Sequence, residues 1–210
     1  MNRRNFISRT ALAAAGTLGT LAGPGWLMAA EAISPTRIRI IYSLHSEKQE
    51  QPDWSNKGFD FKPAMERVNQ LLAKRCPGFE FTPTLATGEA QAKKILEDDK
   101  TAGNIDGYLV YQMNCWNRVV QTIATSGKPV LYADFQFGGS GGFLVYNAAF
   151  LREQTANFGF VASSDPEDLV AAVKCFPVVK SGGTNFAAAT AKARLARTPA
   201  MASSRWRRTT

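Results

Sequence analysis

Short apolar runs alternate with amphipathic stretches along the middle of the chain. Runs rich in β-branched and aromatic residues, each bounded by polar residues, predict strands at 37–44, 79–82, 108–111, 130–133 and 158–162. Apolar residues three and four positions apart predict helices at 61–75, 88–100, 116–124 and 164–176. This alternation predicts an α/β fold: an open, doubly wound, flavodoxin-like and mostly parallel sheet with helices on both faces.

Two of these segments carry further expectations. The strand at 79–82 is expected at a sheet edge, because Pro83 has no N–H to donate to a neighbour. The run Phe143–Phe150 is apolar throughout, so its periodicity leaves a helix and a buried strand open. In the helix at 88–100, the pattern turns a set of charged residues to solvent: Lys93, Lys94, Glu97, Asp98 and Asp99.

The stretch from Ile105 to Gly142 contains a complete strand, helix and strand. Right-handed crossover chirality makes its two strands parallel, and the helix between them is expected to bury Trp116 on its apolar face. In such sheets, ligands bind beyond the carboxyl ends of the strands. The loops at those ends are Gln112–Asn117 and Asp134–Gly142.

The first 32 residues are predicted to be an export signal. Arg3 and Arg4 begin a segment that resembles the twin-arginine motif, an Ala- and Gly-rich apolar run follows, and Ala30-Glu31-Ala32 fits a small-x-small cleavage site. The alternative is a membrane anchor, which the glycines and Pro24 disfavour. The signal predicts export of a folded protein by the twin-arginine translocase and a periplasmic or extracytoplasmic location.

The last segment, 185–210, has a different composition. It contains Ala, Thr, Ser and basic residues, no acid and few large apolar residues, which predicts a disordered basic tail. We favour translation out of frame from near Asn185 over a natural basic tail, because such a composition is typical of a GC-rich gene read in the wrong frame. The predicted domains are therefore 1–32, 33–184 and 185–210.

The distribution of charge argues against nucleic acid as a partner. The formal net charge is +8, but residues 1–30 contribute three arginines and residues 185–210 six basic residues, with no acid in either segment. Residues 31–184 therefore carry a net charge of −1.

The cysteines and the single histidine limit which disulfides and metal sites the chain can form. The three cysteines show no CxxC spacing, so two of them could form a disulfide or could be buried thiols. With His45 as the single histidine, no zinc-type site is expected, and coordination by carboxylates alone remains open.

The segments Ile105–Asn114 and Gly127–Phe137 resemble the amino-terminal domain of the L-fucose and L-arabinose isomerase family. There, an Asp-Gly strand, a polar loop, a helix and a Lys-Pro strand recur in this order, and the resemblance extends over about 37–180. It implies a sugar ligand and, in full-length relatives, oligomers and a divalent metal, usually manganese. The family's metal ligands lie in later domains, so no metal, cofactor or catalytic residue is expected in this chain.

Four residues are candidate sugar contacts. His45, Gln112 and Asn114 match family loops that face the sugar, while Asp134 lies at the end of a predicted strand. Amides and carboxylates there offer paired donors and acceptors to hydroxyl groups. Asp134 could also be a metal ligand. Each residue has a structural alternative: His45 as a hydrogen-bonded loop or core histidine, Gln112 and Asn114 as helix caps, and Asp134 as a helix or turn cap. The glycine-rich segment Phe137–Gly142 is expected to be a mobile loop.

Three functional hypotheses follow. The first is an exported protein of the aldose–ketose isomerase family, present here as an inactive amino-terminal fragment. The second is a periplasmic carbohydrate-binding module without catalysis. The third is a flavodoxin-like domain that holds a cofactor at its glycine-rich loop.

Overall fold

The computed structural model describes residues 34–50, 57–136, 140–180 and 185–197. The predicted export signal and its cleavage site lie outside these ranges. Among the described residues, no helix is both long and apolar enough to cross a membrane.

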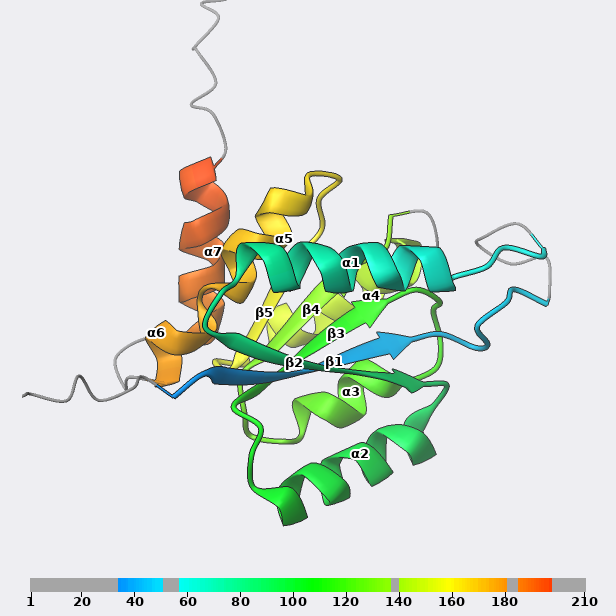
Figure 1. The fold of residues 1–210 in the computed structure, drawn as a ribbon, viewed down its shortest axis with the longest axis horizontal. Coiled ribbons are helices and arrows are strands. Elements are labelled where there is room, and N and C mark those ends of the chain that lie inside the picture. Colours follow the sequence, from blue (N-terminus) through cyan, green and yellow to red (C-terminus); the bar gives the residue numbers. More distant parts are fainter. Residues whose placement is uncertain (1–33, 51–56, 137–139, 181–184, 198–210) are drawn as a thin grey trace, which may run out of the picture. The chain divides into compact units, whose positions relative to one another are not determined.

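Five parallel strands form one sheet in the order β2-β1-β3-β4-β5 (Figure 1). The strands are β1 (Thr36–Ser43), β2 (Phe79–Ala86), β3 (Gly107–Gln112), β4 (Val130–Asp134) and β5 (Phe158–Val161). This confirms the doubly wound, flavodoxin-like α/β fold. The order reverses direction between β1 and β3, which makes their carboxyl ends the topological switch point of the sheet. As predicted, β2 is an edge strand, although it continues past Pro83 to Ala86.

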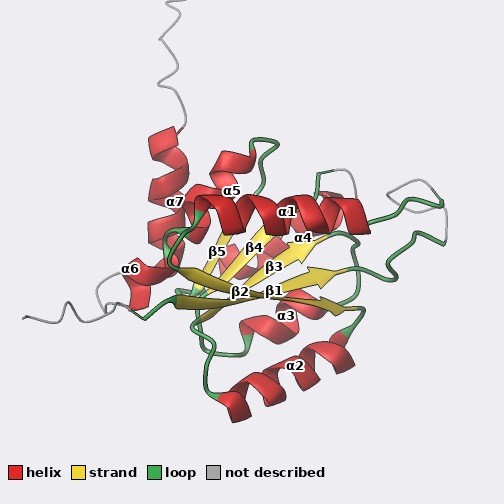
Figure 2. Cartoon of the chain, in the orientation of Figure 1, coloured by secondary structure: helices red, strands yellow, loops and turns green. Residues whose placement is uncertain are grey.

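Helices cover both faces of the sheet (Figure 2). One face packs against α1 (Lys62–Arg75), α5 (Pro166–Val173), α6 (Phe176–Lys180) and α7 (Phe186–Arg197). The other face packs against α2 (Glu89–Ala102), α3 (Val119–Ala124) and α4 (Ser140–Arg152). The segment that includes Phe143–Phe150 is therefore a helix.

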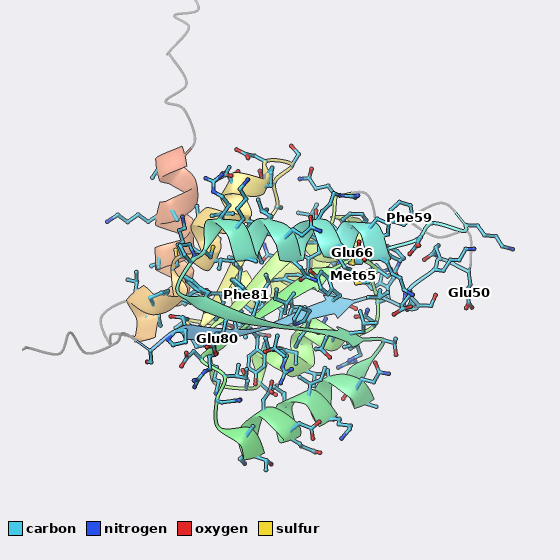
Figure 3. The ribbon with its side chains drawn as sticks, viewed as in Figure 1. Glu50, Phe59, Met65, Glu66, Glu80 and Phe81 are labelled. Carbon is cyan, nitrogen blue, oxygen red and sulfur yellow. The ribbon has the colours of Figure 1, made fainter. Side chains whose placement is uncertain are left out.

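Side chains alternate between these two cores along each strand, as the period of a β-strand requires. In β1, the side chains of Ile38, Ile40 and Tyr42 lie on the face of the sheet that α1 covers. That of Ile41 lies on the face that α2 covers. Figure 3 shows the same alternation in β2, where Phe81 lies on the side that faces α1 and Glu80 on the opposite side.

The predicted outward position of Asp99 is wrong. Its side chain is 1% exposed and forms an ion pair with Arg39 of β1, whose Nε donates to Oδ2 at 3.1 Å. The Asp99 carboxylate also raises the pKa of Tyr108 in β3, adding to the larger effect of burial, to about 12. The last turn of α2 is therefore attached to the sheet by a buried charge, which amphipathic spacing does not reveal.

The chain from Phe186 to Arg197 is a packed helix, whereas its composition predicts disorder. Phe186 is 1% exposed and its ring lies 4.7 Å from that of Phe176, while Thr190 is buried against Gly159 of β5. Alanine is the best helix former, so an Ala-rich segment needs few anchoring side chains once a neighbouring surface is present. Residues 198–210 of the predicted tail lie outside the described ranges.

All three cysteines are buried free thiols. Burial raises the pKa of Cys76 and of Cys175, so less of each thiol is ionised at a given pH. We therefore expect the folded protein to react with less than one equivalent of a disulfide reagent at pH 8, and with three after unfolding in urea. Rapid reaction of the folded protein with two or more equivalents would contradict this burial.

Candidate functional site

The carboxyl ends of three adjacent strands bring the predicted polar residues together. Ser43 of β1 is in register with Gln112 of β3, and Gln112 is in register with Asp134 of β4. His45 and Asn114 are each the second residue after the end of a strand, β1 and β3 respectively. The four candidate residues therefore lie along one edge of the sheet.

Asn114 joins the loops that follow β1 and β3. Its Oδ1 accepts the backbone N–H of His45 at 3.0 Å, and its Nδ2 donates to Oε1 of Gln49 at 3.3 Å. Asn114 and Gln49 are both buried, at 0% and 4% exposure. At the start of α3, the N–H of Val119 donates instead to Oδ1 of Asn117 at 3.3 Å. The geometry thus gives Asn114 a loop-bridging role.

Gln112 and His45 differ in accessibility. Gln112 is 2% exposed and its Nε2 donates to the sulfur of Cys115 at 3.5 Å, so its side chain lies inside the protein. His45 is exposed, and the bond that its backbone N–H makes to Asn114 fixes its position. In this conformation, neither side chain lines the cavity described next.

A cavity of about 390 Å³ lies between α1 and α5, beyond the ends of β3, β4 and β5. Its volume falls in the range of small-molecule sites. Asp134 is the candidate residue that lines it. Its other polar groups are Arg67, Tyr111, Gln136, Ser163, Ser164 and Asp165. Its apolar walls come mainly from α1, Phe135, Val161 and Leu169.

Tyr111 lines this cavity near two charged residues, Asp134 and Arg67. Burial, and then the Asp134 carboxylate, raise its pKa to about 12, while the Arg67 guanidinium acts in the opposite direction. The Tyr111 hydroxyl therefore keeps its proton at neutral pH and remains able to donate. Its ring packs against those of Tyr42 and Phe135, with centroids 6.0 and 6.3 Å away, which holds it in place.

The start of α5 forms the opposite wall. Asp165 caps this helix, with Oδ1 accepting from the N–H of Glu167 at 2.9 Å. This confirms the helix start predicted from the acidic residues and the proline there. The Gln136 amide, oriented so that its oxygen faces donors, accepts from the N–H groups of Ser163 and Ser164 at 3.3 Å. The loops after β4 and β5 are thereby joined across the cavity.

Sequence reasoning found Asp134 but missed the rest of the lining. Tyr111 belongs to an apolar run and was assigned to the strand core, and Arg67 is one of several exposed charges on α1. Ser163 and Ser164 precede a helix cap, which alone explains serines there. The available signal was positional: Tyr111 and Ser163 lie near the carboxyl ends of strands, where ligands of such sheets bind.

The expected burial of Trp116 is wrong. Helix α3 begins at Val119, and Trp116 precedes it with a left-handed backbone (φ 64°) and 57% exposure. Its ring makes an edge contact with that of Tyr146 in α4, at 5.6 Å. A bulky residue with positive φ is uncommon, and the hydrophobic periodicity of the sequence gives no sign of it.

Part of the glycine-rich segment Phe137–Gly142 is helical. Residues 137–139 lie outside the described ranges, but Ser140, Gly141 and Gly142 form the first turn of α4 rather than the expected mobile loop. A Cβ at position 142 would overlap the sulfur of Cys115, so close packing of α4 on the loop after β3 requires this glycine.

The described residues contain no group of three or more His, Cys, Asp or Glu side chains placed to hold a metal ion. What the cavity offers instead is a neutral phenol, a guanidinium, two carboxylates and two hydroxyls around apolar walls. These groups suit a small ligand with several hydroxyl groups.

The fold and site define a flavodoxin-like α/β protein with a cavity of about 390 Å³ at the carboxyl edge of its sheet. No protein-family model and no curated protein matches the sequence. Among solved structures, it is similar to the crystal structure of transcription regulator CcpA of Lactococcus lactis, with 11% identity, a TM-score of 0.30, and coverage of 77% of this chain and 73% of that chain. A similarity this low carries no argument about function.

Proposed function

We propose that this chain is the sugar-facing domain of an exported protein related to the L-fucose and L-arabinose isomerases, and that it binds a monosaccharide in the cavity between α1 and α5. The observation that carries the proposal is the placement of Asp134 and Tyr111 on one wall of a 390 Å³ cavity at the carboxyl edge of the sheet. A carboxylate accepts from two sugar hydroxyls, and a neutral phenol can donate to a third oxygen.

Binding without turnover is the activity expected of this chain. In the related isomerases, a divalent metal, usually manganese, polarises the sugar oxygens during proton transfer. We expect no isomerisation when the purified protein is mixed with sugar and Mn²⁺. A clear rate of aldose–ketose conversion would contradict this expectation and favour a complete enzyme over a carbohydrate-binding module.

The sugar site is tested by calorimetric titration with L-arabinose, L-fucose, D-ribose and D-fructose. We expect millimolar to micromolar binding of at least one sugar, and a loss of about tenfold in affinity for Asp134→Asn, because the amide replaces one acceptor by a donor.

Asn114→Ala is the matched comparison outside the cavity. It removes the bridge to His45 and Gln49, so it should lower stability while leaving the sugar affinity of the folded protein within about twofold. If none of the four sugars binds the wild type, or if Asn114→Ala abolishes binding and Asp134→Asn does not, the cavity is not the sugar site.

A further inference from the structure

Helix α4 exposes apolar side chains along its outer side. Leu144 is 65% exposed, Val145 55% and Leu151 58%, whereas Phe143 is buried and stacks on Tyr132 of the sheet. The outer side of α2, on the same face of the sheet, carries charged residues instead, which form two exposed ion pairs. A scattered apolar residue at a surface needs no explanation, but a contiguous group of them marks a binding surface.

Trp116 extends this apolar side of α4 onto the loop between β3 and α3. Its exposed ring contacts that of Tyr146 in α4. Its φ of 64° is one that asparagine or glycine adopts more readily, so the backbone does not explain a tryptophan there. We call the residues of this group the α4 surface: Trp116, Leu144, Val145, Tyr146 and Leu151.

The α4 surface lies in a basic part of the chain. Residues 107–152, from β3 through α4, contain Arg118, Lys128 and Arg152 and a single acid, the buried Asp134, which gives a net charge of +2. The whole of 31–184 carries −1, so the remainder of that range carries −3. This asymmetry favours a partner that combines negative charge with apolar groups.

Two exposed arginines lie beside the α4 surface. Arg118 immediately precedes α3, 3.6 Å from Glu89 of α2, and Arg152 ends α4, followed by the exposed Glu153. Between 135 and 151 the sequence has no charged residue. Long arginine side chains can reach a negative partner while the surface itself remains apolar.

A second copy of this chain fits the α4 surface poorly. In a two-fold contact the surface faces itself, so the arginines of the two copies would approach each other, and residues 135–151 offer no acid to pair with them. A stable interface also takes roughly 20 residues from each partner, many more than this surface has. An anionic bilayer offers hydrocarbon to the aliphatic side chains, an interface that tryptophan and tyrosine favour, and phosphate to arginine.

We propose that the α4 surface binds peripherally to an anionic lipid bilayer. Helix α4 then lies along the membrane plane, with its aliphatic side chains inserted below the headgroups and Trp116 and Tyr146 among them. The cavity between α1 and α5 is on the opposite face of the sheet, so it stays open to the solution. This inference goes beyond the proposed function and does not depend on sugar binding.

Vesicle flotation of the full chain tests the proposal. We expect binding to vesicles of equimolar phosphatidylcholine and phosphatidylglycerol, and at least about fivefold weaker binding to phosphatidylcholine alone. Leu144→Glu should weaken binding to the anionic vesicles by about tenfold, because it places a charge against the acyl chains. Gln70→Glu makes the same change of net charge on the exposed side of α1, and should leave binding within about twofold. Equal binding of the two variants would overturn the proposal.

The fluorescence of Trp116 reports on the α4 surface itself. Trp116→Asn suits the left-handed backbone, so this variant should fold, and the signal that it loses is that of Trp116. We expect anionic vesicles to reduce acrylamide quenching of this signal by at least about twofold, because the ring moves among the headgroups. Unchanged quenching in vesicle-bound protein would show that another segment holds the chain to the membrane, and would overturn the proposal. So would a dimer, detected by sedimentation, that Leu144→Glu dissociates, because a second copy would then cover the surface.

Discussion

Replacing Asp99 by alanine should lower the free energy of unfolding by about 3 kcal/mol, near the lower end of the range for breaking a buried ion pair. The substitution leaves Arg39 without its partner at a position where 21% of its side chain is exposed, and the Tyr108 hydroxyl loses an acceptor. Chemical denaturation in urea, followed by far-ultraviolet circular dichroism, measures the change.

Asp98→Ala is the matched control. Asp98 precedes Asp99 on α2 and pairs with Lys94 at 3.3 Å, but that pair is exposed, so its loss should change stability by no more than about 0.5 kcal/mol. Both substitutions raise helix propensity equally, so their difference reports burial. Equal effects of the two variants would mean that both carboxylates face solvent, as the sequence pattern predicts.

The contrast between these two neighbours shows what sequence patterning captures. Apolar periodicity assigned the α2 helix and its apolar side correctly, because burying apolar residues such as Ala92 positions the whole helix. It assigned Asp99 wrongly because the partner, Arg39, lies 60 residues away on β1. A long-range pair of opposite charges leaves no periodic signal in either element.

The parallel sheet was predictable for a related reason. Runs such as Tyr108–Val110 and Val130–Ala133 are buried on both faces, which is typical of parallel strands covered by helices. In α4, by contrast, the exposed Leu144, Val145 and Leu151 hide the period of an amphipathic helix. Composition alone therefore left that element undecided between helix and strand.

Of the residues that line the cavity, only the one whose position follows from a single strand was predictable from the sequence. Asp134 follows a buried run, and the general rule for open sheets places a ligand there. The cavity itself is formed by α1 and α5, about a hundred residues apart in the sequence, whose facing surfaces no local pattern defines. Asn114 shows the converse: it lies just beyond a strand end, but its amide oxygen and nitrogen both bond to groups in the loop after β1.

Replacing Gly159 by alanine should destabilise the protein by about 2 kcal/mol, because α7 occupies the space that the methyl group needs. A Cβ at this position would lie 2.8 Å from Thr190 Cγ2 and closer still to its Oγ1. In a strand without such a neighbour, the same change would be neutral or stabilising, because glycine loses more conformational freedom on folding. The sign of the effect thus reports whether α7 is docked.

Thr190→Ala supplies the complementary variant. It removes the two nearest atoms, so Gly159→Ala should cost at least about 1 kcal/mol less in the Thr190→Ala background than in the wild type. Urea denaturation of the four proteins measures this coupling. A stabilising effect of Gly159→Ala in the wild type, with no coupling to Thr190, would show that the segment from Phe186 onward is unpacked in solution, as its composition predicts. A destabilising effect that Thr190→Ala relieves would show that this Ala-rich segment packs on the sheet, on the face that α5 also covers.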